Sequence, residues 1–289
     1  MAGVNARIAA ISDDGVAALR PALEAAKREL QKALTEWLRT APNAEARFTA
    51  QHLRSALLQV DAALRAVKRL HPQMAEGLRF RSKILGRYSV EDVMAQVAEF
   101  SSRFGTPLVV DLDTAALIAR GDRMLIPQYE ASALRYAGRV GSDIRLQLGI
   151  GVLRGETFGE LKHRLAGLGS FRAAVRPSLG SAEETAALSG ERLFRKYGFW
   201  AERVVRTELM HGYNLQHGEA TREVAKLDDE IGERWDSAGD FRRCELCRTL
   251  DGQFRKVDQW FSAMGLVFKQ PPAHPLCRCI RVTWRKDWG

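Results

Sequence analysis

Two short stretches near the C-terminus, Cys244-Glu-Leu-Cys247 and His274-Pro-Leu-Cys277-Arg-Cys279, point to a small metal-stabilised fold. They contain all four cysteines of the 289-residue chain. Thiolates and imidazoles are the ligands of tetrahedral zinc sites, in which two close-spaced ligand pairs are commonly separated by a loop. The spacing therefore predicts a zinc-knuckle-like element, in which a structural metal replaces a core too small to stand alone.

Five candidate ligands compete for the four positions of a closed zinc site. We expect Cys244, Cys247 and His274 to bind, with Cys277 or Cys279 as the fourth ligand. The rival set uses both Cys277 and Cys279 without His274. The N-terminal residues show no secretory signal, so we expect a cytoplasmic protein, where a metal site is favoured over disulfides. Free or catalytic thiols are the remaining alternative.

Charge and hydropathy restrict the classes of partner. No apolar run is long enough to span a bilayer, so no membrane contact is expected. The net charge is +9, and residues 241–289 carry ten Lys and Arg against four Asp and Glu. This excess predicts contact with nucleic acid or an acidic protein surface, although a solvated basic face is an equally good interpretation. The candidate contact residues are Arg242, Arg243, Arg278 and Arg281.

The first seventy residues carry two apolar stripes at helical spacing, over 23–38 and 53–67. The short break at Thr40-Ala-Pro42-Asn43 predicts that these helices pack antiparallel as a hairpin. The hairpin is either purely structural or a docking arm for an oligomeric partner. Further helices are predicted over 89–103, 127–153 and 182–232, the last broken near Gly198, with residues 108–112 as a short buried strand or extended linker and Thr157 as a helix cap.

After Gly232 the pattern changes to short alternating runs with glycines and aromatic residues, which indicates short strands around the cysteines. The fold class is thus predicted as mainly α with a small α+β C-terminal lobe. Its parts are an N-terminal helical hairpin (1–72), a central helical region (73–180) and a C-terminal domain (181–289). The aromatic residues expected to form the small core around the site are Trp235, Trp260, Phe261 and Trp284.

An ordered set of motifs in the C-terminal third resembles a known family. Arg206-Thr207-Glu208 and Asn214 on a helix are followed by Trp235, Asp240 and the first cysteine pair, then by Leu250-Asp251-Gly252 and the closing Pro271-Pro-x-His-Pro-x-Cys-Arg-Cys279. This order is similar to that of the phage Mu F-like minor head proteins, also called phage head morphogenesis proteins. The match spans roughly 193–284, and the upstream Gly155-Glu-Thr-Phe158 also fits it.

The resemblance implies a role rather than a reaction. It implies a minor head protein of a tailed phage or prophage that binds the portal protein or the major capsid protein from inside, with nonspecific contact to packaged DNA as a further expectation. It implies no enzymatic activity and no small-molecule substrate. The protein would be made in a bacterial cytoplasm and end up in the virion, inside the head or at the portal.

The remaining motif residues have structural explanations that we favour over catalytic ones. Arg206 and Glu208 are expected to form ion pairs or to tie their helix to the zinc lobe by hydrogen bonds. Asp240 is expected to cap the turn before Cys244. The rival functions are a zinc-dependent nuclease or toxin, with His274 and Glu208 near the metal, and a sequence-tolerant DNA-binding module.

Overall fold

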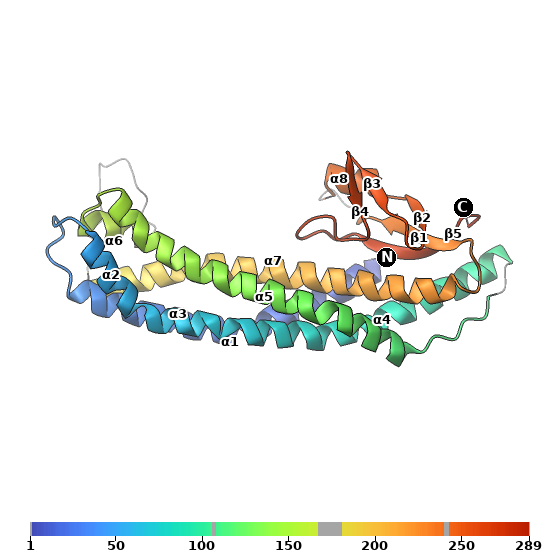
Figure 1. Ribbon diagram of the computed structural model, residues 1–289, viewed down its shortest axis with the longest axis horizontal. Helices are drawn as coiled ribbons and strands as arrows, with labels where there is room; N and C mark the ends of the chain where they lie inside the picture. The colour runs from blue at the N-terminus through green and yellow to red at the C-terminus, as the bar shows by residue number, and fades with distance from the viewer. Residues whose placement is uncertain (1, 106–107, 167–180, 240–242, 289) are drawn as a thin grey trace. The chain divides into compact units, whose positions relative to one another are not determined.

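The computed structural model describes residues 2–105, 108–166, 181–239 and 243–288 (Figure 1). Within these ranges the chain is mostly helical, with a few short antiparallel strands near the C-terminus, which confirms the predicted fold class. None of the described helices is both long and apolar enough to cross a membrane. The helices are α1 (Ala2–Arg39), α2 (Ala50–Gln59), α3 (Asp61–Lys68), α4 (Leu70–Phe104), α5 (Thr114–Leu153), α6 (Phe158–Ala166), α7 (Ala182–Val224) and α8 (Glu245–Leu250).

The chain forms two compact units, each assembled from segments far apart in sequence. One unit comprises residues 16–74 and 133–201, and the other comprises residues 1–15, 75–132 and 202–289. The long helices α1, α4, α5 and α7 contribute residues to both units. The division into residues 1–72, 73–180 and 181–289, which rests on the sequence alone, remains a prediction.

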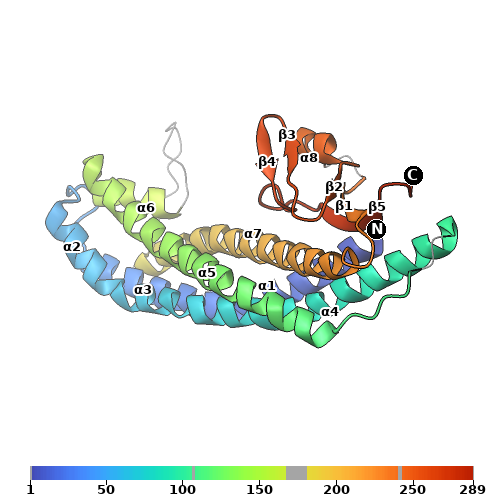
Figure 2. The same cartoon turned by 45° about the vertical axis from the view of Figure 1, so that its right-hand side comes forward.

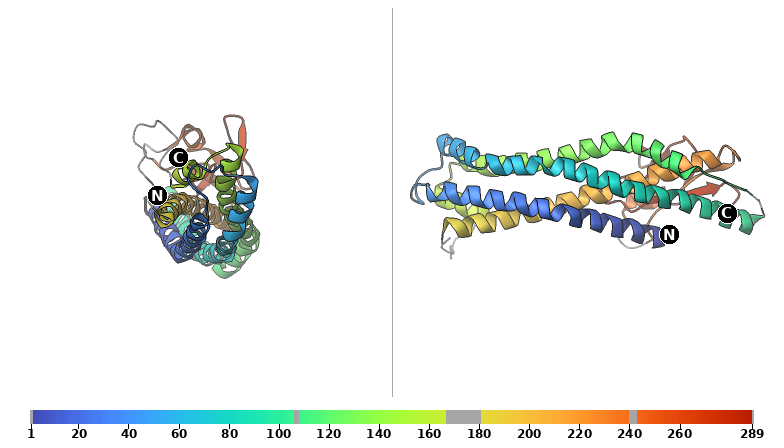
Figure 3. Two further views of the ribbon diagram at one scale, coloured as in Figure 1. Left: turned by 90° about the vertical axis from the view of Figure 1, so that its left-hand side faces the viewer. Right: turned by 90° about the horizontal axis from the view of Figure 1, so that it is seen from below.

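In the unit of residues 16–74 and 133–201, the chain reverses between α1 and α2, as the predicted hairpin requires (Figure 3). Trp37, Phe48 and Phe158 pack against one another there, with ring centroids 5.5–5.8 Å apart. Thr157 caps α6 as expected: its hydroxyl accepts the Glu160 N–H, and the Glu160 carboxylate accepts the Thr157 N–H. This reciprocal pair is a capping box.

The other unit carries the C-terminal lobe beside the last part of α7 (Figure 1). A three-stranded antiparallel sheet has the order β2-β1-β5, and β3 and β4 form a separate hairpin. The sheet lies next to α7, whereas α8 and the β3–β4 hairpin lie on the far side of the sheet (Figure 2). The strands are β1 (Ile231–Asp236), β2 (Phe254–Lys256), β3 (Phe261–Ala263), β4 (Leu266–Phe268) and β5 (Ile280–Arg285).

Several predicted helix boundaries are wrong. Helix α5 begins at Thr114 and continues through Pro127, where the predicted helix began. Proline has no N–H to donate to the carbonyl four residues earlier, but Pro127 is exposed, so this carbonyl can bond to water. Helix α7 also continues through Gly198, between the buried Tyr197 and Ala201. It ends at Val224 rather than near Gly232, where β1 already runs.

The segment 108–112 is an extended linker and not a buried strand. It has no strand partner among the described residues, and Val109 is 93% exposed. Helix α4 ends at Phe104, immediately before Gly105. Gly105 has a φ of 68°, a left-handed conformation that glycine adopts without steric cost.

Candidate metal centre

The four cysteines and His274 converge in the C-terminal lobe, where they could hold a metal ion. Cys244, Cys247 and His274 form one group, and Cys247, Cys277 and Cys279 form a second, with the ligand atoms in each within 4.8 Å of one another. His274 Nε2 lies 3.2 Å from the sulfurs of both Cys244 and Cys247. Cys247 Sγ lies 3.7 Å from Cys277 Sγ, so Cys247 joins the two groups.

Helix α8 presents the first cysteine pair. Cys244 is the N-cap of α8, and its sulfur accepts the Cys247 N–H at 3.4 Å. One helical turn therefore places both sulfurs at the same end of the helix. The turn that follows α8 relies on Gly252, whose φ is 76° and whose N–H donates to the Trp235 carbonyl at 2.8 Å. Asp251 accepts hydrogen bonds from the Ser237 N–H and from Arg243.

Hydrogen bonds within the cluster favour a thiolate at Cys277. The thiols of Cys247 and Cys279 donate to its sulfur and hold the pKa of Cys277 well below that of a free thiol. Burial lowers the pKa of His274, but its backbone bond to Pro275 and the nearby Cys277 and Cys244 sulfurs raise it overall. The cluster thus favours a thiolate at Cys277 where a cation would bind, and thiolate is the form of cysteine that ligates metal.

A small apolar core surrounds the cysteines. Trp235 and Phe261 are fully buried, with ring centroids 5.2 Å apart, as predicted. Trp260, in contrast, is 56% exposed, so its predicted core position is wrong. Trp284 is buried but packs against Phe100 of α4, away from the cysteines. The core residues are Trp235, Cys247, Leu250, Phe261, Ala263, Cys277 and Cys279.

Two side chains of α7 hold the second cysteine segment against this helix. The Leu276 N–H donates to the Thr207 hydroxyl at 3.1 Å. Asn214 is fully buried: its amide nitrogen donates to the Cys279 carbonyl, and its amide oxygen accepts the Arg281 N–H at 2.7 Å. Asn214 therefore bonds to the backbone on both sides of Ile280, at the start of β5.

Arg206 and Glu208 bond elsewhere in the same unit. Arg206 forms ion pairs with Asp13 at 2.6 Å and Glu202 at 3.2 Å, and the Glu208 carboxylate accepts a hydrogen bond from Ser132 at 2.6 Å. Of the two expected outcomes, ion pairing is therefore the one found for Arg206. Glu208 belongs to neither of the metal-binding groups found among the described residues.

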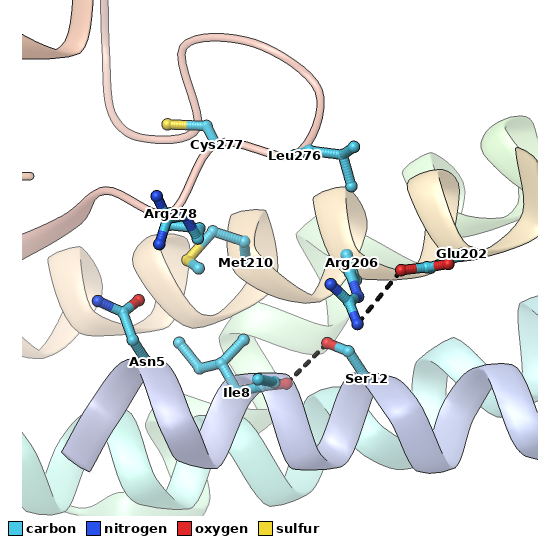
Figure 4. A pocket seen from close by; sticks show the side chains of 10 residues that line it. Asn5, Ile8, Ser12, Glu202, Arg206, Met210, Leu276, Cys277 and Arg278 are labelled. Atoms are coloured by element: carbon cyan, nitrogen blue, oxygen red, sulfur yellow. Dashed lines mark hydrogen bonds and ion pairs between the residues drawn. The ribbon is translucent and has the colours of Figure 1, made fainter. Parts of the chain in front are cut away.

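The candidate contact arginines differ in their environments. Arg281 is 5% exposed and pairs with the buried Glu233, so it cannot serve as a surface contact as predicted. Arg243 bonds to Asp251 and Ser237 within the lobe. Arg242 and Asp240 lie outside the described residues. Arg278 is partly exposed, and its side chain points away from that of Cys277 (Figure 4).

Arg278 and Arg206 line a pocket of about 300 Å³ beneath the Leu276–Arg278 segment (Figure 4). The pocket lies between α1 and α7, and its apolar lining includes Ile8 and Met210. The polar lining includes Glu202, which pairs with Arg206. Opposite charges are therefore already paired at its wall.

The sequence motif included Thr207 without assigning it a role, and Glu233 was not identified from the sequence at all. Thr207 precedes Asn214 by seven residues, a spacing that places both on the same face of a helix. This helical spacing is the sequence feature that could have identified Thr207 as a second contact to the lobe. No sequence signal identifies Glu233 as the partner of Arg281, because the pairing depends on the register of β1 and β5.

Comparison of the chain with protein-family models, with curated proteins and with solved structures gives no match.

Proposed function

We propose that this chain is a non-enzymatic minor head protein of a tailed phage or prophage, similar to the Mu F-like head morphogenesis proteins. The observation that carries the proposal is the ordered motif set of the C-terminal third. Its members Thr207, Asn214 and the Cys279 segment are up to 72 positions apart in sequence, yet they bond directly to one another or to adjacent residues. The motif residues thus connect α7 to the lobe that carries the cysteines.

The metal in this proposal is a structural zinc ion bound by Cys244, Cys247, His274 and Cys277. Ligands about 2.3 Å from a tetrahedral zinc lie roughly 3.7–3.8 Å apart, a separation close to the 3.7 Å between the Cys247 and Cys277 sulfurs. Cys279 would remain in the apolar core beside Trp235. Four protein ligands leave no position for a catalytic water, which fits a structural role.

A matched pair of variants tests the ligand set. Cys277→Ser should lose bound zinc, measured by mass spectrometry of metal content after purification, because it removes a ligand. Cys279→Ser should retain one zinc per chain, since it removes only a thiol of the core. If Cys279→Ser loses zinc and Cys277→Ser retains it, Cys279 is the ligand and Cys277 the core thiol. If both variants retain zinc, neither cysteine is a required ligand and the proposed ligand set is rejected.

The proposed partner is the portal protein or the inner face of the major capsid protein, with nonspecific DNA contact through the basic lobe. The protein would be made in the bacterial cytoplasm and assembled into the head. Co-expression with the portal and capsid proteins of neighbouring genes, followed by gradient sedimentation, tests this. Migration with assembled particles or portal rings at a fixed sub-stoichiometric ratio is expected. A chain that stays at the top of the gradient would reject the proposal.

The placement of the described acidic and histidine residues favours the structural role over the competing nuclease function. It requires a general acid or base close to a metal with an open coordination position. Glu208 lies outside both metal-binding groups of the described residues and accepts a hydrogen bond from Ser132. His211 and His217 are shielded, and burial lowers their pKa values to about 4 and about 3, so both are neutral at pH 7.

A further inference from the structure

The β3–β4 hairpin exposes four large apolar side chains, Trp260, Met264, Leu266 and Val267, each 54–63% exposed. We refer to these four residues as the hairpin patch. Phe261 and Phe268 pack against Trp235 on one face of the hairpin, and the exposed Leu266, which pairs with the buried Ala263, lies at the border of that same face. Val267, which pairs with Ser262, lies on the opposite face. The core therefore fixes the hairpin on one face and leaves the patch exposed. Clustered apolar residues of this kind mark interaction surfaces more often than single exposed residues do.

One edge of the hairpin is already occupied. The Gln253 side chain donates to the Ser262 carbonyl at 2.9 Å and accepts the Ser262 N–H at 3.4 Å. Both backbone groups of Ser262 therefore point away from β4. Gln253 thus occupies the backbone positions at which an additional strand would pair with β3.

The other edge of the hairpin is open. Ser262 pairs with Val267 across the two strands, and residues opposite each other in an antiparallel pair direct their backbone groups the same way relative to the ladder. The N–H and C=O of Val267 therefore point outward from β4. Among the described residues, none bonds to these two groups. An open edge with exposed apolar side chains is a template for an added strand.

Charge determines which strand fits this edge. Lys269 follows β4 directly, is exposed and forms no ion pair with a described carboxylate. Arg255, in contrast, bonds to the Trp260 carbonyl at the β3 edge, beside Gln253. A second copy of the chain would bring two basic lobes together, and lysine at a strand edge disfavours such self-pairing. An acidic partner would be attracted to Lys269.

We propose that the outer edge of β4 is the docking site for an extended acidic segment of a partner protein. The segment adds a strand beside Val267 and covers the hairpin patch. The backbone bonds supply affinity, alternate apolar side chains contact the patch, and an acidic residue at the end of the segment approaches Lys269. This inference goes beyond the proposed function because it names a surface and a binding mode without depending on a phage partner.

A defined peptide tests the proposal on the full chain. The probe is a synthetic strand of alternating Val and Thr with two Glu at each end, and the control peptide carries Lys instead of Glu. We expect the Val267 amide signal of ¹⁵N-valine-labelled protein to shift on titration with the acidic peptide. Binding of the lysine-ended peptide should be at least about tenfold weaker, since its charge has the wrong sign.

Variants separate the edge from the rest of the lobe. Val267→Pro removes the outward N–H at an edge position where proline is tolerated, and should abolish peptide binding. Val267→Thr keeps that N–H and should bind like the wild type. Lys269→Glu leaves the hairpin backbone unchanged and should weaken binding of the acidic peptide severalfold. This variant tests the proposal even if Val267→Pro does not fold.

Three outcomes would overturn the inference: no binding of the acidic peptide at millimolar concentration, equal binding by Val267→Pro or Lys269→Glu, or equal binding of both peptides. Analytical ultracentrifugation gives a fourth arm. A wild-type dimer that Val267→Pro converts to a monomer would make a second copy, rather than an acidic partner, the occupant of this edge.

Discussion

A buried side-chain amide connects α7 to the C-terminal lobe that carries the cysteines. Asn214→Ala would leave the Arg281 N–H and the Cys279 carbonyl without their partners in a fully buried position. Each unsatisfied buried group costs about 1–3 kcal/mol. We expect the free energy of unfolding of the lobe to fall by about 2–4 kcal/mol, measured by urea denaturation, with faster hydrogen exchange at the Arg281 amide.

Thr249→Ala is the matched control within the same lobe. Thr249 is exposed, and its hydroxyl bonds only to the carbonyl of Glu245 in α8. Its replacement should change stability by less than about 0.5 kcal/mol, as is usual for surface positions. Equal effects of the two variants would mean that Asn214 does not connect the helix to the lobe.

A buried histidine near this joint makes stability depend on pH. His217 is fully buried, and burial, reinforced by nearby Arg281, lowers its pKa to about 3. In the unfolded chain a histidine has a pKa near 6.5. Between these values the unfolded state binds a proton that the folded state does not. Stability is therefore lost as pH falls below about 6.5, by up to about 1.4 kcal/mol per pH unit.

His217→Gln isolates this contribution, because glutamine does not titrate. Urea denaturation at pH 6.5 and pH 4.5 should show a loss for the wild type that exceeds the loss for the variant by about 2 kcal/mol. Acid release of metal affects both proteins and cancels in the difference. Parallel pH profiles would show that His217 is protonated in the folded state as well.

At the scale of helices, glycines allow α4, α5 and α7 to approach one another around Gln216. A Cβ built on Gly121 of α5 would lie 2.7 Å from Gln216 Cγ, and one on Gly86 of α4 would lie 1.8 Å from its Oε1. Gln216 is buried and donates to the Ser82 carbonyl, so it is confined between these two glycines. The close approach explains why glycine occupies the interior of two helices.

Two alanine substitutions in α5 should therefore have opposite signs. Gly121→Ala should destabilise the protein by about 1–3 kcal/mol through overpacking. Gly138→Ala should stabilise it by about 0.5–1 kcal/mol, because Gly138 is exposed, nothing lies within 4 Å of its added Cβ, and alanine is the better helix former. Thermal denaturation of both variants checks this. Stabilisation by both would show that Gln216 adapts without cost.

The sequence predicted which helices form more accurately than where each helix begins and ends. Apolar periodicity located the helices because each must bury one face, and the cysteine spacing located the lobe. Pro127 and Gly198 misled, since a breaker residue in a long helix is tolerated when buried neighbours such as Tyr129 and Tyr197 hold the helix in place. The spacing of the cysteines and His274 predicted that these residues come together. The Arg281–Glu233 pair depends instead on the register of β1 and β5, which the local sequence does not encode.

At the scale of the whole chain, ion pairs determine which basic residues remain available to a partner. In the lobe Arg243 pairs with Asp251, Arg285 with Asp228 and Asp287, and Arg281 with Glu233. Charges that are already paired contribute little to long-range attraction. Lys269, which follows β4 and forms no ion pair with a described carboxylate, is thus a better candidate for recognition than these arginines.

The two compact units should respond differently to metal removal, if the cysteine cluster holds structural zinc as proposed. Structural zinc contributes about 10–16 kcal/mol in small domains, so chelation should unfold the lobe and accelerate amide exchange at Trp235 and Leu250 by at least about 100-fold. The unit of residues 16–74 and 133–201 has its own core around Trp37 and contains no cysteine. Exchange at Trp37 should not change.

Hydrogen exchange with mass spectrometry, before and after zinc is stripped, measures both units in one experiment. In a Cys244→Ser chain the lobe should exchange rapidly from the start, and the chelator should add nothing. Unchanged exchange at Trp235 and Leu250 after complete removal of zinc would mean that the apolar core of the lobe is sufficient without metal. Loss of protection at Trp37 would mean instead that the units unfold together, since α1, α4, α5 and α7 contribute residues to both.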